Sequence, residues 1–408
     1  MADGHDARDS APVNRRTFLE MGAVPVAALA GGAGLKAAQG PRSNTPARQG
    51  GAPASRPADG AQDGPHLPIR IGLIGAGENV RDVMIPAFRR IPECQLVAVA
   101  NTSLASSRRV ATEFDIPRPY AHWKALLDDA DVDAVVIGTW PYMHHTLTLA
   151  SLAVGKHVLC QARMANNAQE AREMLAASLA HPDLVCQLVP TSTSYQVDNV
   201  LKRLLAEGYT GEVLSVEIQR VGRGFADRNG PLDWRHNYEF SGLNFLNVGG
   251  TYESMMRWLG RGTRVMAMAK VHVPYRRGAG GTRMSVALPD HVDVLYELAN
   301  GAQVHMRFSE TTGLSQGNQT WIHGSEGTLY VDARQAVFGG KREDVALEEI
   351  PNPPADRATS RVELEFVNAI RGLEPVTTNT FEIGVHYMEW TEAVHRSAKT
   401  GQAVHLPL

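Results

Sequence analysis

The chain has 408 residues, of which 43% are hydrophobic and 20% are charged, and its formal net charge at pH 7 is -3. This length indicates two domains, and the composition is that of an ordinary globular protein. The weakly acidic balance gives no reason to expect a nucleic acid as a partner. Three cysteines, Cys94, Cys160 and Cys186, lie in apolar runs without metal-ligand spacing, so we expect core residues and neither a metal site nor a disulfide framework.

The first 66 residues are predicted to lie outside the fold. Residues 14–19, Asn-Arg-Arg-Thr-Phe-Leu, are typical of a twin-arginine export signal, and a mildly apolar stretch follows from Met21 to Leu35. At about 15 residues, with several glycines, this stretch is too short to span a bilayer of roughly 30 Å. We therefore expect a signal region over 1–38, export by the twin-arginine translocase and a periplasmic or other extracytoplasmic location. Residues 39–66 are rich in Ala, Gly, Pro, Gln and Ser and are predicted to be a flexible linker.

A dinucleotide-binding domain is predicted over residues 67–190. Pro68 to Ile74 is a short apolar run typical of a buried parallel strand, Gly75-Ala76-Gly77 follows at once, and a helix is expected from Val80 to Arg90. Gly75 permits the tight turn of a Rossmann phosphate loop, and Gly77 lets the backbone approach a pyrophosphate at the helix N-terminus. The third glycine of the pattern is absent, so the prediction depends on the strand before the loop and the helix after it.

The second strand predicts how the ribose is held. It runs from Leu96 to Ala100, and Asn101 stands at its tip, where an acidic residue usually binds the adenosine ribose. Asparagine can hydrogen-bond a ribose but does not repel a 2′-phosphate, so both NAD and NADP remain candidate cofactors. Further strands at Ala134–Ile137 and His157–Cys160, with a helix from about His144 to Ala153 between them, continue the βαβ alternation.

Several motifs in fixed order resemble the glucose-fructose oxidoreductase, inositol dehydrogenase and rhizopine-catabolism (Gfo/Idh/MocA) family. They are Asp131–Thr139, Pro141, His144, Gly155–Cys160, Gly211–Val216, Asp233-Trp234-Arg235, Arg257–Gly260, Gly324–Gly327 and Ser397–Gly401. The resemblance implies an α/β protein in which the Rossmann domain precedes an α/β domain over 191–408 with a large open antiparallel sheet. It also implies a carbohydrate-like substrate and a homo-oligomer that forms through the open sheet.

The sequence of the second domain supports this architecture independently. Apolar-rich runs at Val292–Leu298 and Gln303–Phe308 flank Ala299-Asn300-Gly301-Ala302, which predicts a hairpin. Val265–Val273 and Thr328–Val331 are also predicted to be strands. A helix is expected over Val200–Ala206, ended by Gly208.

With the resemblance, the predicted cofactor site includes turn and polar residues of the first domain. They are Gly75, Gly77, Glu78, Asn79, Asn101, Thr102, Ser103, Thr139, Trp140, Pro141, His144, Gln161 and Ala162. The resemblance makes His144 a cofactor-side or helix-entry residue rather than a base.

The chain departs from the family where the chemistry is expected. Family dehydrogenases carry Glu-Lys-Pro after the strand that ends at Cys160, and here these positions hold Gln161, Ala162 and Arg163. The family pattern Asp-x-Gly-x-His-x-x-Asp has become a segment with Asn247, Thr251 and Ser254 at its three key positions. Oxidation of an alcohol requires removal of the hydroxyl proton, so some other group must act as the base.

Three residues are candidate catalytic substitutes. Arg163 could supply a fixed positive charge but would be a poor base, because it stays protonated; otherwise it forms a structural ion pair. Tyr252 could act as acid or base, or it could be a packed helix residue, and Glu253 is the conventional carboxylate. The predicted substrate contacts are Arg235, Asn247 and Thr251, and no metal ligand is predicted.

These features favour an NAD(P)-dependent oxidoreductase acting on a sugar, polyol or glycoside. Export favours a retained and internally recycled cofactor, because no dinucleotide pool is expected outside the cytoplasm. Two alternatives remain open at this level. One is a lyase or glycosidase that works by transient oxidation, and the other is a non-catalytic protein that binds a carbohydrate or nucleotide.

Overall fold

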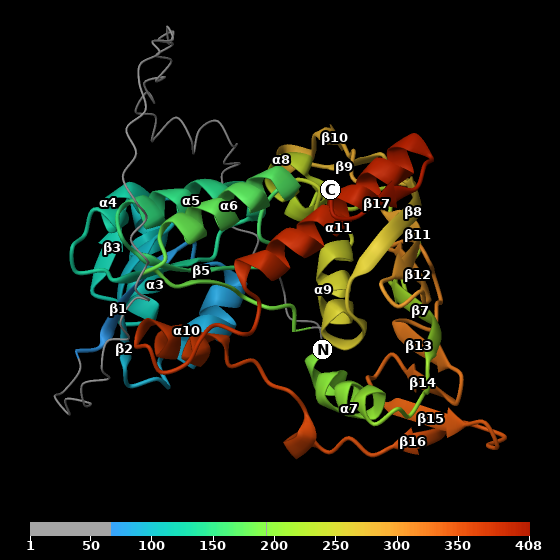
Figure 1. The fold of residues 1–408 in the computed structure, drawn as a ribbon. Helices are drawn as coiled ribbons and strands as arrows, with labels where there is room; N and C mark the ends of the chain where they lie inside the picture. The colour runs from blue at the N-terminus through green and yellow to red at the C-terminus, as the bar shows by residue number, and fades with distance from the viewer. Residues whose placement is uncertain (1–66, 193) are drawn as a thin grey trace, which may run out of the picture.

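A computed structural model describes residues 67–192 and 194–408 (Figure 1). The predicted signal region and linker lie outside these residues. Within the described part of the chain, no helix is long and apolar enough to cross a membrane.

The first domain is built on a six-stranded sheet in the order β3-β2-β1-β4-β5-β6, with every neighbouring pair parallel. Its strands are β1 Ile69–Ile74, β2 Cys94–Ala100, β3 Arg118–Tyr120, β4 Ala134–Ile137, β5 His157–Cys160 and β6 Cys186–Leu188. Its helices are α2 Ile85–Phe88 (preceded by a π-helical turn, Val80–Met84), α3 Leu104–Glu113, α4 Trp123–Leu127, α5 Pro141–Ala153 and α6 Ala168–Ala180. All four residues of β4 are buried, because helices cover both faces of a parallel sheet. The predicted Rossmann topology is confirmed.

The second domain carries a nine-stranded sheet in the order β16-β15-β14-β13-β7-β12-β11-β8-β17. Its strands are β7 Val213–Val221, β8 Gly262–Lys270, β11 His291–Leu298, β12 Gln303–Ser309, β13 Gln319–Gly324, β14 Gly327–Val331, β15 Val337–Lys341, β16 Glu348–Ile350 and β17 Val404–His405. A two-stranded sheet joins β9 Tyr275–Arg277 to β10 Arg283–Ser285. The predicted hairpin is β11 and β12, whose turn closes where Leu298 N–H donates to Ala302 O.

The large sheet differs from the expectation in one respect. It was predicted to be antiparallel, but β12 pairs with β7 in parallel while its other neighbour, β11, is antiparallel, so the sheet is mixed. The two parallel strands are far apart in sequence, and α9 and β8 lie between them along the chain. A connection of this length permits parallel pairing, which a short turn would not.

Helices lie on one face of the large sheet only (Figure 1). They are α7 Tyr195–Ala206, α8 Tyr238–Ser241, α9 Val248–Leu259 and α11 Phe381–Thr400, and short 3-10 turns occur at Trp234–His236, Ala279–Gly281 and Pro354–Asp356. On β12 the covered face holds Val304, Met306 and Phe308, all buried, whereas His305 and Arg307 on the other face contact Asp293. This alternation along the strand gives the sheet a helix-covered inner face and an outer face.

The C-terminal segment belongs to both domains. The predicted boundary between residues 190 and 191 lies between β6 and α7, but α10, Val362–Ile370, returns to the first domain. Its Phe366 is fully buried in the same apolar cluster as β1, and α11 packs against α6. The division of the chain at one point is therefore too simple, because burial of the apolar face of α10 requires the Rossmann sheet.

Candidate active site

The phosphate loop has the geometry that its two glycines predict. Gly75 has a φ of +85°, and a Cβ there would lie 2.8 Å from the backbone nitrogen of Thr139. A Cβ on Gly77 would meet nothing within 4 Å. The backbone conformation and the close approach of Thr139 thus require a glycine at position 75. At Gly77 the lack of a side chain instead leaves an open surface at the start of the helix, as a bound pyrophosphate would need.

Asn101 holds this loop in place. Its Oδ1 accepts a hydrogen bond from Ala76 N–H at 2.7 Å, and its Nδ2 donates to Ser106 Oγ at 3.2 Å. Ser103 caps α3, because its Oγ accepts from the N–H of Ser106, and Thr102 is exposed beside it. The structure therefore gives Asn101 a role in the loop, and its contact with a ribose stays a prediction.

The carboxyl end of β5 is tied to the same loop. Gln161 Nε2 donates to Asn79 Oδ1 at 2.7 Å, and Asn79 and Glu78 are exposed at the start of the helix. Ala162 follows and has no polar side chain to offer. The parallel strands thus bring the residues predicted around β1 and β5 to one edge, where a Rossmann domain binds its dinucleotide.

His144 connects the two loops beside that edge. Its Nδ1 lies 2.9 Å from Arg163 O and its Nε2 lies 2.9 Å from Thr139 O. Burial lowers the pKa of His144, against the opposing effect of these carbonyl oxygens. The residue is fully buried near the start of α5 and positions the backbone of both loops, which agrees with a helix-entry role.

Trp140 and Pro141 begin α5 and contribute differently. Pro141 occupies the first helical turn, where no N–H is needed. The Trp140 ring stacks on Trp234 at a centroid distance of 5.7 Å and lies 4.9 Å from the Phe240 ring. These contacts attach the cofactor edge of the first domain to the segment that follows β7.

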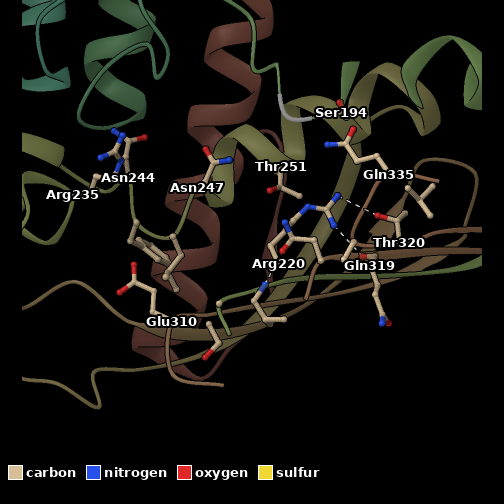
Figure 2. A pocket seen from close by; sticks show the side chains of 18 of the residues that line it. Ser194, Arg220, Arg235, Asn244, Asn247, Thr251, Glu310, Gln319, Thr320 and Gln335 are labelled. Atoms are coloured by element: carbon tan, nitrogen blue, oxygen red, sulfur yellow. Dashed lines mark hydrogen bonds between the residues drawn. The ribbon is translucent and has the colours of Figure 1, made fainter. Parts of the chain in front are cut away.

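A cavity of about 590 Å³ lies against the inner face of the large sheet (Figure 2). Arg163, three residues after the end of β5, borders it from the first domain. Arg163, Arg235, Asn247 and Thr251 all line it, so the structure brings the three predicted substrate contacts together with one predicted catalytic residue. Arg163 Nη1 donates to Asn247 Oδ1 at 3.1 Å. This hydrogen bond joins the loop after β5 to the residue that precedes α9.

Arg163 is a half-buried cation without a carboxylate partner among the described residues. Its Nε is buried and has no hydrogen-bond partner there. Burial lowers the pKa of Arg163 to about 10, and the neighbouring charge of Arg235 acts in the same direction. The alternative prediction for Arg163 was a structural ion pair. Among the described residues Arg163 forms none, and its side chain contacts the amide of Asn247 instead.

The predictions for Tyr252 and Glu253 are wrong. Tyr252 is 2% exposed, its ring stacks on Trp390 at 4.4 Å, and its hydroxyl accepts from Gly262 N–H at 2.9 Å. Burial raises the pKa of Tyr252 to about 12, which is unsuited to a base. Neither residue lines the cavity, because successive residues of a helix point about 100° apart and only Thr251 faces it.

Glu253 belongs to a structural ion-pair group. It is 1% exposed, pairs with Arg257 and accepts a hydrogen bond from Thr191 N–H at 2.9 Å. Arg257 also contacts Asp198 on α7 at 3.0 Å. Burial raises the pKa of Glu253, and these contacts oppose the shift. The group joins α9 to α7 and is not available to a substrate.

Sequence reasoning missed most of the cavity wall, including the charged or titratable residues Arg220, His236 and Glu310. His236 Nε2 lies 2.9 Å from Glu310 Oε2, and Arg276 Nη2 lies 3.3 Å from the same oxygen. Burial disfavours the charge on Glu310, but the contacts with these two residues outweigh it and lower its pKa. The available signal was the Asp-Trp-Arg motif immediately before His236, whereas Glu310 follows β12 without any motif.

His236 is the only histidine among the described residues that line the cavity. A carboxylate beside an imidazole orients the ring and stabilises its protonated form. In the described part of the chain, no cluster of three or more potential ligands could hold a metal ion. The site therefore combines a dinucleotide edge, fixed positive charge and one histidine–carboxylate pair.

Comparison with known proteins agrees with this arrangement. Levoglucosan dehydrogenase of Pseudarthrobacter phenanthrenivorans is 26% identical over 317 residues, covering 71% of this chain and 78% of that protein. Trans-1,2-dihydrobenzene-1,2-diol dehydrogenase of Sus scrofa is 28% identical over 267 residues, covering 65% and 74%. A solved structure of levoglucosan dehydrogenase with NADH and L-sorbose has a TM-score of 0.73 at 20% identity, covering 83% of this chain and 99% of that one, which shows a shared fold.

Two family descriptions match adjacent parts of the chain. Residues 69–198 match the oxidoreductase family with an NAD-binding Rossmann fold, and residues 199–330 match the Gfo/Idh/MocA C-terminal domain. The chain belongs to the Gfo/Idh/MocA oxidoreductase family, whose first domain is an NAD-binding Rossmann fold.

Proposed function

We propose that this protein is an NAD(P)-dependent oxidoreductase that acts on a carbohydrate bound in the cavity between β5 and the large sheet. The position of Arg163 carries the proposal. Arg163 comes three residues after the end of β5, at the edge where a Rossmann domain presents its nicotinamide, and it also lines the cavity. The relatives named as sugar and diol dehydrogenases support this assignment.

The residues present fit a dinucleotide. The open surface at Gly77, the loop held by Asn101 and the polar side chains of Asn79 and Gln161 would hold it. When bound, the nicotinamide supplies hydride chemistry. Asn101 carries no charge that would repel a 2′-phosphate, so this proposal covers both NAD and NADP.

We propose that His236 replaces the missing acid–base residues of the family. Its Nδ1, which has no hydrogen-bond partner among the described residues, would accept the proton of the substrate hydroxyl, and Glu310 would orient the ring through its contact with Nε2. Arg163, fixed by Asn247, would hold positive charge beside the reacting oxygen without itself giving up a proton. In this proposal Ala162, Asn247 and Thr251 mark the loss of the usual lysine, acid and histidine.

We further propose that the protein is exported by the twin-arginine translocase with its cofactor bound, and that the cofactor is retained and recycled. The sequence motif at residues 14–19 supports export. We also propose a homo-oligomer that forms through the outer face of the large sheet. Exposed apolar side chains on that face, Met266, Met268 and Leu295, support it, because such residues favour association.

Substrate turnover in two histidine variants tests the function. Purified protein is first denatured, and the released nucleotide is identified by mass spectrometry. A panel of sugars, polyols and glycosides is then followed for both cofactor reduction and product formation. His236→Gln is expected to reduce turnover by about 10²- to 10⁴-fold, the usual contribution of a positioned acid–base group.

His305→Gln is the matched control. His305 also pairs with a carboxylate, with its Nε2 3.2 Å from Asp293 Oδ1, but it lies on the outer face of the sheet. We expect this variant to keep wild-type turnover. A protein that neither carries nor binds a dinucleotide, or a His236→Gln variant with full activity, would contradict the proposal.

A further inference from the structure

The inner face of the large sheet carries a cation where apolar residues are expected. Strand β7 places Val216, Ile218 and Arg220 on one face, because residues two apart along a strand point the same way. Val216 and Ile218 are each 1% exposed and belong to the main apolar core. Arg220 continues their row at the point where the core ends and the cavity begins.

Only neutral groups contact the Arg220 guanidinium. Its Nη1 donates to the carbonyl oxygens of Gln219 and Gln319 at 2.9 and 3.0 Å. Its Nη2 donates to Thr320 Oγ1 at 3.2 Å, and Figure 2 shows Arg220 beside Gln319 and Thr320. Among the described residues, no carboxylate lies within ion-pair distance. Burial without a compensating charge lowers the pKa of Arg220 to about 10.

The acidic residues of the cavity wall are already engaged elsewhere. Glu310 contacts His236 and Arg276, and Asp332 contacts Arg334 at 3.1 Å. Arg220 is half-buried, and a partly desolvated charge without a counter-charge costs free energy. Its presence in the wall of a cavity therefore points to an anionic ligand that completes it.

The free donors of Arg220 suit a flat anion. A guanidinium has five N–H groups, and the hydrogen bonds to described residues use three of them, leaving the Nε–H and one Nη2–H. Two such donors match the two oxygens of a carboxylate or a phosphate. Figure 2 shows the guanidinium directed from the sheet into the cavity, toward Thr251 and Gln335. Arg163 borders the same cavity from the first domain, so two cations approach it from different walls.

We propose that Arg220 binds an anionic group of the substrate, and that the substrate is a sugar bearing a carboxylate or a phosphate. This inference rests on the proposed function, since it names the substrate class of the same cavity. The charged group lies on the sheet at Arg220, and the carbon that reacts faces Arg163 and His236.

Calorimetric titration of the NADH-loaded protein tests the inference. The probes are D-glucuronate for the carboxylate, D-glucose 6-phosphate for the phosphate and D-glucose as the neutral sugar. We expect at least one anionic probe to bind the wild type about tenfold or more tightly than glucose does, because hydrogen bonds to charged groups contribute about 1.5–3 kcal/mol. The anion that binds better identifies the source of the charge.

Arg220→Met should remove that preference, and Arg307→Met is its matched control. Arg307 lies on the neighbouring strand β12 but on the outer face, where it pairs with Asp293 at 3.0 Å. We expect Arg220→Met to lower the affinity for the anionic probe by about 10- to 100-fold and to leave the affinity for glucose unchanged. Arg307→Met should bind all three probes as the wild type does.

Thermal unfolding without sugar separates a binding role from a structural one. Because Arg220→Met removes a half-buried charge that has no counter-charge, its melting temperature should equal or exceed that of the wild type. A large fall in the melting temperature of Arg220→Met, together with loss of binding of all three probes, would show that Arg220 has a structural role. That result would overturn the inference. No binding of either anionic probe, or equal affinity for acidic and neutral sugars, would also overturn it. Failure of the proposed function would give a different result. The anionic probe would then bind in a manner that depends on Arg220, but no hydride transfer would be detected.

Discussion

Alanine substitutions of the two phosphate-loop glycines should have opposite effects on stability and on cofactor binding. In Gly75→Ala, the new Cβ would lie 2.6 Å from Thr139 Cγ2 and 2.8 Å from the Thr139 backbone nitrogen, at a φ of +85°. The left-handed conformation costs an alanine about 1–2 kcal/mol. Overpacking against backbone that cannot rotate away adds about 1–3 kcal/mol.

The free energy of unfolding of Gly75→Ala should therefore fall by about 2 to 5 kcal/mol. At about 2–4 °C for each kcal/mol in a domain of this size, the melting temperature should drop by roughly 4 to 20 °C. Gly77→Ala places its Cβ where nothing lies within 4 Å, and its φ is not in the left-handed region. Its stability without cofactor should match that of the wild type or slightly exceed it.

Gly77→Ala, the more stable of the two variants, should be the one that binds the cofactor poorly. The Gly77 methyl group would occupy the surface that a pyrophosphate approaches, so Gly77→Ala should lose most of its affinity for NAD and NADP while remaining folded. Calorimetric melting of apo protein and fluorescence titration with NADH are the two assays. If Gly77→Ala binds dinucleotide as well as the wild type, or if Gly75→Ala is fully stable, the assignment of this loop is refuted.

Three other substitutions test separate parts of the structure. Asn101→Asp keeps an acceptor for Ala76 N–H but adds a negative charge, so dissociation constants should show NADP weakened much more than NAD; equal weakening would mean that Asn101 does not face the ribose. Tyr252→Phe leaves Gly262 N–H buried without its acceptor, so chemical denaturation should show a loss of about 1–3 kcal/mol while turnover stays intact, and lost turnover would restore a catalytic role. Met268→Glu adds charge to an outer-face side chain that is 80% exposed, so light scattering should report a smaller oligomer, and an unchanged mass would exclude this face as the interface.

Much of the first domain could be predicted from the sequence because its signals are local. The strand before Gly75, the loop and the helix after it are contiguous, and buried parallel strands appear as short apolar runs. The β11–β12 hairpin was also predictable, since a short turn joins its strands. The expectation that Ala162, Asn247 and Thr251 replace the family lysine, acid and histidine also comes from the sequence alone, and it stays a prediction.

The catalytic surroundings depend on contacts between distant segments. Thr251, Tyr252 and Glu253 are consecutive, and only their direction on α9 places the first in the cavity and the other two in packed interiors. His236 meets Glu310 across 74 residues, and no local pattern marks that pairing.

The same limit applies to the large sheet and to Arg220, the half-buried cation on its inner face. The parallel pairing of β7 with β12 joins strands separated by a helix and other elements, so nothing in either strand alone specifies it. Arg220 stands in an otherwise ordinary strand sequence. Its lack of a counter-charge became evident only when β13 and the cavity wall were in place around it, because burial and pairing are properties of the packed structure.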